Sequence, residues 1–281
     1  MTAYRGIFVS DLDGTLLRGG RISPGDLQAF AGLKDHGVLR VIATGRSLHS
    51  AEACLPPDFP ADYVVLSTGN QVLHWGTREV LRSSRLLGGE IRAICSVLHG
   101  LGVSFMVHDD FPGNHGFAYR RGPRPVEDFE RRLALHAPHG REMGDCSEMG
   151  VASQFVAIVE AGDAGLHERI AAELDGLSVI RATSPLDGRS AWIEIFAAGV
   201  SKAAGVRDIL TRHGLHGALV AAIGNDHNDR DMLDMAHVPF KVGDSFLGDD
   251  DAYITAPNTS DAVAEAIAHY TELLQQDTRH P

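Results

Sequence analysis

Two carboxylates stand beside a glycine directly after the first apolar run of the chain. Asp11 and Asp13 follow residues 7–9 and precede Gly14 in the sequence DLDGT. Ligands of open α/β sheets bind at the carboxyl ends of the strands, so a loop at this point is placed for chemistry. The first carboxylate can attack phosphorus as a nucleophile, and the second can pass a proton to a leaving alcohol and later take one from water. Gly14 permits the sharp turn that brings backbone amides toward a phosphate.

The same five residues have two other interpretations. DxDG also opens calcium-binding loops, but such a loop needs a third ligand, a glycine at its sixth position and a distal Glu, and here the sixth residue is Leu16. An Asp-Gly pair also forms ordinary turns. The pattern favours the catalytic interpretation over both.

Two further candidate sites come later in the chain. Thr44, Gly45 and Arg46 follow a predicted strand at residues 38–43, where a hydroxyl and exposed amides can cradle a phosphate. Arg46 is a candidate for a substrate or phosphate contact, and a surface arginine at a helix start is the alternative. Lys202 lies in the first turn of a predicted helix, where the helix dipole disfavours a cation, so we expect it to have an anionic partner.

A cluster of oxygen-bearing side chains follows a predicted strand at residues 219–223. The sequence from 224 to 232 is GNDHNDRDM, with three Asp and two Asn within seven residues. Carboxylate and amide oxygens are the ligands that Mg²⁺ prefers. An acidic helix N-terminus is the alternative, but the helix dipole does not explain two Asn at a spacing of three. The cluster therefore predicts a magnesium site.

The order of the predicted elements says how these motifs are positioned. Strands at residues 7–9, 38–43 and 63–66 alternate with single helices, and this rhythm returns after residue 202. It predicts a parallel sheet with right-handed crossovers. Between the two stretches, two strands for each helix predict a separate α+β unit. We therefore predict an α/β fold with a Rossmann-like parallel-sheet core, residues 1–82 and 190–281, interrupted by an inserted α+β domain at residues 83–189.

Composition narrows the class of protein. The net charge of −12 argues against a general binder of nucleic acid or of anionic membranes. The sequence has no apolar run long enough for a membrane span and no signal-peptide pattern. Three cysteines, Cys54, Cys95 and Cys146, show no metal-binding spacing, which suggests reduced thiols in a cytoplasmic protein. The oligomeric state is not predicted.

Several motifs in a fixed order carry a family resemblance. The sequence resembles the haloacid dehalogenase superfamily of phosphohydrolases, in particular its Cof-type subgroup (class IIB, with a C2 cap), which carries its cap between the second and third motifs. The resemblance covers nearly the whole chain. Its motifs are DLDGTLL (11–17), ATGR (43–46), GVSKAAGV (199–206), GNDHNDRDML (224–233) and DAYITAPNTSDAVAEAI (251–267).

The resemblance implies a role for each site residue. Asp11 would be the nucleophile and a Mg²⁺ ligand, while Asp13 would be the general acid and base and would ligate the metal through its backbone carbonyl. The expected phosphate- and substrate-binding residues are Thr44, Gly45, Arg46, Lys202 and Asn228, the expected metal-site residues are Asp11, Asp13, Asn225 and Asp229, and the inserted domain would be the cap.

One position departs from the family pattern. Most relatives have an Asp after Gly224 as a direct metal ligand, and this chain has Asn225. An amide oxygen can still coordinate Mg²⁺, but the site loses one negative charge, so we expect weaker metal affinity. Asp226 could replace Asn225 by a small loop shift, whereas Asp229 is expected to orient a metal-bound water.

The expected function is hydrolysis of small phosphorylated metabolites, with sugar phosphates as the first choice. The resemblance to sugar phosphatases is an analogy at the level of the fold. A phosphomutase would use the same nucleophile, and a non-catalytic protein that binds phosphometabolites is a third possibility, to which Asn225 alone points. The sequence does not name the substrate.

Overall fold

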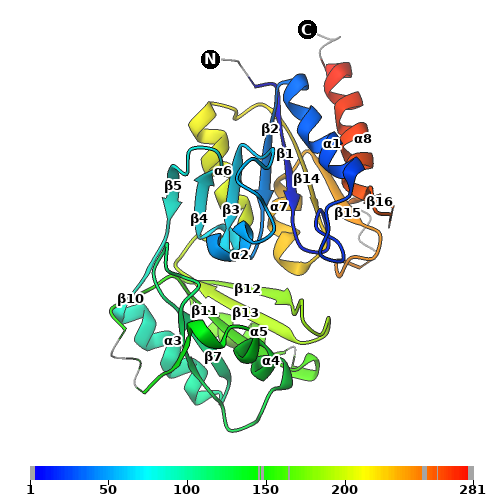
Figure 1. The fold of residues 1–281 in the computed structure, drawn as a ribbon. Coiled ribbons are helices and arrows are strands. Elements are labelled where there is room, and N and C mark those ends of the chain that lie inside the picture. The colour runs from blue at the N-terminus through cyan, green and yellow to red at the C-terminus, as the bar shows by residue number, and fades with distance from the viewer. Residues whose placement is uncertain are drawn as a thin grey trace. The chain divides into compact units, whose positions relative to one another are not determined.

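The computed structural model describes residues 4–144, 146, 149–163, 165–248, 252–257 and 259–277. The chain forms two compact units (Figure 1). The core unit comprises residues 1–46, 51–82 and 201–281, and the smaller unit comprises residues 47–50 and 83–200.

One mixed sheet runs through the core unit, in the order β16-β15-β14-β1-β2-β3-β4-β5. The strands from β16 to β3 run parallel, and β4 turns back antiparallel to β3. The sheet is built from β1 (Gly6–Asp11), β2 (Val38–Ala43), β3 (Tyr63–Leu66), β4 (Gln71–His74), β5 (Val80–Ser83), β14 (Leu219–Gly224), β15 (Val238–Val242) and β16 (Ile254–Ala256).

The apolar run of β1 explains its central position. All six residues of β1 are buried, because helices cover both faces of the sheet. Ile7 and Val9 belong to a cluster with residues of α6 and α7. Phe8 lies on the opposite face against Tyr270 of α8, with 5.8 Å between the ring centroids. The core helices are α1 (Pro24–Gly32), α6 (Lys202–His213), α7 (Arg230–Met235) and α8 (Ala262–Asp277), and the short α2 (Leu48–Glu52) spans both units.

Two of the core helices begin at side-chain caps. Ser23 accepts a hydrogen bond from the backbone N–H of Asp26, with Pro24 in the first turn, as the sequence of α1 predicts. Ser201 caps α6 in the same way through the N–H of Ala204. These caps fix where each helix starts, and the cap at Ser201 therefore sets the position of Lys202.

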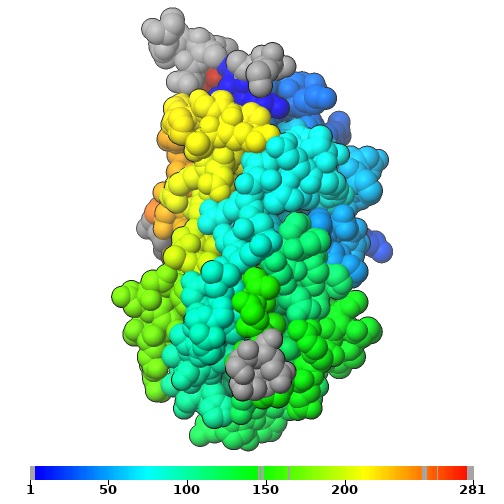
Figure 2. Space-filling model, turned by 90° about the vertical axis from the view of Figure 1, so that its left-hand side faces the viewer, coloured from blue at the N-terminus to red at the C-terminus, as the bar shows by residue number. Residues whose placement is uncertain are grey.

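The β4–β5 hairpin, which was not predicted from the sequence, lies beside α6 (Figure 2). Two ion pairs join the two elements. Arg82 binds Asp208 at 3.1 Å, and Arg212 binds Glu79 at 2.7 Å.

The smaller unit is built on a six-stranded sheet in the order β12-β13-β11-β7-β8-β9, with a two-stranded pair β10-β6. Phe105 and Val107 pack into a cluster with α3 and α5, whereas Met106 packs on the opposite face with α4, as expected from strand alternation. The elements are β6 (Leu86–Leu87), α3 (Gly88–Gly100), β7 (Ser104–His108), β8 (Phe117–Arg120), α4 (Glu127–Leu135), β9 (Gly140–Glu142), β10 (Val151–Ala152), β11 (Gln154–Val159), α5 (Gly165–Glu173), β12 (Ser178–Thr183) and β13 (Ala191–Phe196).

Two expectations from the sequence differ from the structure. The predicted boundary at residue 190 assigns β13 to the core, but β13 pairs along its length with β11 and β12 of the smaller unit, which extends to Val200. A short apolar strand carries no signal of which sheet it joins. The expectation of three reduced thiols is also wrong, because Cys95 and Cys146 form a disulfide. The fold brings α3 beside the segment after β9, a proximity that cysteine spacing does not reveal. Cys54 lies outside this disulfide, and its thiol donates a hydrogen bond to the carbonyl oxygen of Ala51 at 3.3 Å.

None of the helices in the described part of the chain is long and apolar enough to cross a membrane.

Candidate active site

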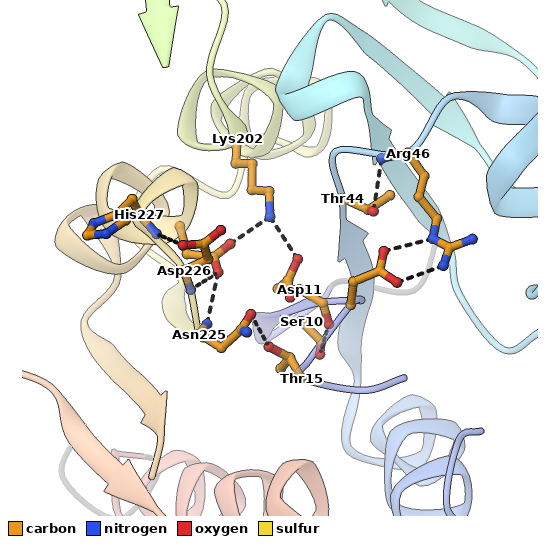
Figure 3. Close-up of polar contacts among 11 residues, drawn as sticks. Ser10, Asp11, Thr15, Thr44, Arg46, Lys202, Asn225, Asp226 and His227 are labelled. Atoms are coloured by element: carbon orange, nitrogen blue, oxygen red, sulfur yellow. Dashed lines mark hydrogen bonds and ion pairs between the residues drawn. The ribbon is translucent and has the colours of Figure 1, made fainter. Parts of the chain in front are cut away.

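The candidate site lies where three core strands end (Figure 3). The carboxyl ends of β1, β2 and β14 are neighbours because the strands are adjacent and parallel. Asp11 ends β1, Thr44 follows β2, and Asn225 follows β14. Motifs that are more than 200 residues apart in the sequence therefore meet at one edge of the sheet.

Lys202 is bound between two carboxylates. Its Nζ lies 2.8 Å from Asp11 Oδ1 and 2.6 Å from Asp229 Oδ1. The Lys202 side chain is only 1% exposed. Burial opposes its charge, but the two carboxylates outweigh burial and raise the pKa of Lys202 above its ordinary value. The anionic partner expected for Lys202 is thus a pair of carboxylates.

The nucleophile candidate Asp11 is buried in the same group. Burial, followed by the charge of Asp229, raises the pKa of Asp11, and Lys202 opposes this increase. A carboxylate in such an environment needs nearby positive charge to remain ionised. Lys202 supplies part of that charge, and a cation at the other oxygen of Asp11 would supply more.

Asp229 holds both the lysine and its own loop. Its Oδ2 accepts hydrogen bonds from the backbone N–H groups of Asn225 at 2.9 Å and Asp226 at 3.0 Å. Gly224 leaves no room for a side chain, because a Cβ there would clash with Asp229. Since Oδ1 binds Lys202 and Oδ2 binds two backbone N–H groups, both oxygens of Asp229 accept from protein donors. Its expected role toward a metal-bound water stays a prediction.

The Asn225 amide faces three oxygens of the DLDGT loop. One of its terminal atoms lies 3.1 Å from Asp11 Oδ2, 3.1 Å from the carbonyl oxygen of Asp13 and 3.2 Å from Thr15 Oγ1. If this atom is Oδ1, it accepts a hydrogen bond from the Thr15 hydroxyl. If it is Nδ2, it donates toward all three oxygens.

These positions fit a magnesium ion. An octahedral Mg²⁺ with bonds of about 2.0–2.1 Å places adjacent ligand oxygens about 3 Å apart. The Asn225 position lies 3.1 Å from both Asp11 Oδ2 and the Asp13 carbonyl oxygen, which matches this spacing, and with Oδ1 there the three atoms offer one carboxylate and two neutral oxygens. In the described residues, no group of three or more His, Cys, Asp or Glu side chains could hold a metal by itself. A site here must therefore use the carbonyl and the amide.

Arg46 binds the second carboxylate of the motif. Its Nε and Nη2 donate to the two oxygens of Asp13, each at 2.7 Å. Thr44 Oγ1 accepts from the backbone N–H of Arg46 at 3.1 Å, which orders the turn that contains Gly45. The role of Arg46 as a phosphate contact stays a prediction, since the structure shows its guanidinium on Asp13. This bidentate pair was not predicted from the sequence.

Other residues complete the site. Asn228 is partly buried in the 3₁₀ turn His227–Asp229, next to Asp229. Asp231 was not assigned from the sequence, and its Oδ2 accepts from the N–H of Ala203 in the first turn of α6. The motif residue Thr15 was also missed, and its position after DLDG was the available signal.

A strained turn lies against the start of α6. Ser67 and Thr68 have φ angles of 45° and 55°, in the left-handed region that side chains disfavour. Their N–H groups donate to the carbonyls of Arg46 and Thr44 respectively. The turn thus ties the ends of β2 and β3 together beside the site.

Comparison with known proteins establishes the family. The model for haloacid dehalogenase-like hydrolases matches residues 8–267, and the chain belongs to this family. The expected family and the α/β fold class are thereby confirmed.

Solved structures share the fold at low sequence identity. The subclass IIB sugar phosphatase BT4131 is 18% identical, with a TM-score of 0.75 over 95% of this chain and 99% of that one. The phosphatase BT1666 from Bacteroides thetaiotaomicron is 20% identical, with a TM-score of 0.74 and 96% of both chains covered. SMU.1108c from Streptococcus mutans UA159 is 17% identical, with a TM-score of 0.77 over 95% of this chain and 98% of that one.

Proposed function

We propose that this protein is a magnesium-dependent phosphatase that hydrolyses small phosphorylated metabolites, sugar phosphates first among them, through an aspartyl-phosphate formed on Asp11. One observation carries the proposal. Lys202 binds one oxygen of Asp11, and the other oxygen lies 3.1 Å from the Asn225 amide, which is also 3.1 Å from the Asp13 carbonyl oxygen. This arrangement surrounds a nucleophile with the positive charge and metal ligands that phosphoryl transfer requires.

Asp11 would attack phosphorus in line with the leaving oxygen. Mg²⁺, when bound, supplies positive charge to the phosphoryl oxygens and to the attacking carboxylate. Lys202 adds charge from inside the fold, where it cannot be screened by solvent. Thr44 and Asn228 are proposed to hold phosphoryl oxygens, as the family resemblance implies.

Asp13 would move the proton. In the first step it would donate a proton to the leaving oxygen, and in the second it would take one from the water that attacks the aspartyl-phosphate. Both of its oxygens accept from Arg46, so one must be released for the proton to move. Arg46 is then a positioning residue that orients Asp13 between the two steps.

The substrate class rests on similarity of fold. The subclass IIB neighbour is a sugar phosphatase, which supports a sugar phosphate as the substrate of this chain. The smaller unit is proposed to act as the cap, because specificity in such proteins lies in the inserted domain. Cytoplasmic localisation stays a prediction. Because Cys95 and Cys146 form a disulfide, the expected reduced thiols no longer support it.

Phosphate release from a panel of phosphorylated metabolites, with and without Mg²⁺, tests the proposal. Wild type, Asp11→Asn and the exposed control Asp35→Asn would be compared. We expect magnesium-dependent release by wild type and the control, and a loss of at least about a thousandfold in Asp11→Asn. Substantial phosphate release by the Asp11→Asn variant would exclude Asp11 as the nucleophile. If folded wild type releases no phosphate but binds the metabolites, the protein is a non-catalytic binder.

A further inference from the structure

The amide of Asn225 can make two different sets of contacts from one position. With Nδ2 toward the loop, it donates to Asp11 Oδ2, the Asp13 carbonyl and Thr15 Oγ1 at 3.1–3.2 Å. With Oδ1 toward the loop, it faces the first two oxygens as a third acceptor, and only the Thr15 hydroxyl can donate to it. A rotation of 180° about the last side-chain bond exchanges the two arrangements without moving the backbone.

Without a cation, electrostatics favours the donating arrangement. An Oδ1 atom of Asn225 that lies 3.1 Å from both Asp11 Oδ2 and the Asp13 carbonyl oxygen is repelled by them unless a proton or a metal lies between, and one of these two belongs to a carboxyl group. Lys202 cannot relieve this repulsion, because it binds the other oxygen of Asp11 and Asp229. The N–H group of Asn225 can, because it lies within hydrogen-bond distance of these oxygens.

With a cation, the preference reverses. An N–H group aimed at the shared oxygens would meet the cation with its positive end, whereas Oδ1 adds a third ligand oxygen at 3.1 Å from the other two, a spacing that fits Mg²⁺. An Asp at this position has no N–H group, so it could serve only the metal-bound state.

We propose that the Asn225 side chain substitutes for the metal in the metal-free protein: its N–H group holds Asp11 and the DLDGT loop together, and the amide rotates to present Oδ1 when Mg²⁺ binds. The inference rests on the metal site of the proposed function. It explains what this chain gains from an amide at this position. The metal-free site stays assembled, and metal affinity falls, because binding must first break the hydrogen bonds of the amide.

The neighbouring glycine fits a rotating amide. Gly14 has a φ of 82° and lies against the Asn225 side chain, so that a Cβ on Gly14 would clash with the amide. The absence of a side chain leaves room for either terminal atom of Asn225 on that side. An alanine at position 14 would be strained by its backbone angle as well.

Thermal unfolding in EDTA, followed by titration with MgCl₂, tests the inference with Asn225→Ala and Asn225→Asp. Gln28→Glu, an exposed residue of α1, is the matched control for the added charge. In EDTA we expect Asn225→Ala to unfold about 2–5 °C below wild type, and Asn225→Asp to unfold lower still, because it adds repulsion to the lost hydrogen bonds. Saturating Mg²⁺ should restore Asn225→Asp, which should bind Mg²⁺ at least about tenfold tighter than wild type. Gln28→Glu should follow wild type throughout.

Nuclear magnetic resonance of wild type, labelled with ¹⁵N on asparagine, gives a reading that needs no variant to fold. In EDTA the side-chain N–H₂ of Asn225 should exchange with solvent slowly, and Mg²⁺ should shift its resonance and speed its exchange. Equal melting of wild type and Asn225→Ala in EDTA, or fast exchange of this amide without metal, would overturn the inference. Neither measurement uses a substrate, so a protein that releases no phosphate but shows both effects would refute the proposed function and keep the inference.

Discussion

Lys202 in the core unit and His108 in the smaller unit are both buried ionisable side chains, but one is charged and the other is neutral. Both side chains are almost completely buried, at 1% and 7% exposed. Lys202 has two carboxylates within 2.8 Å and keeps its charge. His108 has no salt-bridge partner among the described residues, and burial, together with the nearby charge of Arg132, lowers its pKa to about 3.

The hydrogen bond of His108 fits a neutral ring. Its Nδ1 lies 2.8 Å from the carbonyl oxygen of Asn114, which can only accept, so Nδ1 carries the proton. The comparison shows that burial alone does not decide the charge of a group. Anionic partners decide it: two carboxylates bind Lys202, whereas no salt bridge to His108 is found in the described residues.

Removal of the charge of Lys202 gives the largest expected effect. Lys202→Met would leave the carboxylates of Asp11 and Asp229 buried side by side without a cation. We expect a loss of about 3–5 kcal/mol in unfolding free energy and of all measurable phosphate release. Urea unfolding at pH 7 checks the first figure. A variant as stable as wild type would show that Lys202 does not compensate these carboxylates.

Acid should destabilise the protein through His108. Its pKa in the folded state, about 3, is below the ordinary value of 6.5. The unfolded chain therefore takes up a proton as the pH falls below 6.5, while the folded chain does not, and stability declines. Between pH 7.5 and pH 5 the loss from this residue is about 2 kcal/mol.

Urea unfolding of His108→Gln at both pH values measures that loss. The variant should lack about 2 kcal/mol of the pH dependence of wild type, whereas His99→Gln, at an exposed position, should retain all of it. If His108→Gln and wild type respond identically to pH, then the histidine binds its proton equally well in the folded and unfolded chains, and the contrast with Lys202 fails.

Asp26 tests, for an acidic side chain, whether the partners of a buried group decide its charge. Of the changes in stability predicted here, its effect is the smallest. Its side chain is buried, Oδ1 accepts from the N–H of Ala264 at 2.7 Å, and no cation is paired with it in the described structure. Burial raises its pKa to about 6, against an ordinary value of 3.8. The folded state therefore binds the proton more tightly, and this contribution is present below pH 3.8 and lost as the pH rises through 6.

The loss from Asp26 between pH 4.5 and 7.5 is at most about 2 kcal/mol. Asp26→Asn should not show it, and denaturation curves of wild type and variant at the two pH values give the difference. A pH dependence that is unchanged in Asp26→Asn would mean that the carboxylate is ionised in the folded state despite its burial.

The sequence predicted the elements of the core better than the pairing of side chains within the site. The apolar strands at residues 38–43 and 219–223 and the cap at Ser23 are encoded by local residue order, and the structure contains them. The meeting of Asp11 with Asn225 follows from parallel strands that end at one edge. The pairing of Arg46 with Asp13 depends on a turn whose direction no spacing rule gives. The sheet membership of β13 and the Cys95–Cys146 disulfide depend likewise on long-range packing.

The position of β1 in its sheet has a consequence for the order in which the chain can fold. β1 lies between β2 and β14, so one of its two edges cannot pair until residues 219–224 are present. A ribosome makes those residues only after the entire continuous segment 83–200 of the smaller unit. During synthesis the smaller unit can therefore form before the core sheet closes. Until then the edge of β1 is open beside Asp11, and the nucleophile has neither its lysine nor its metal loop.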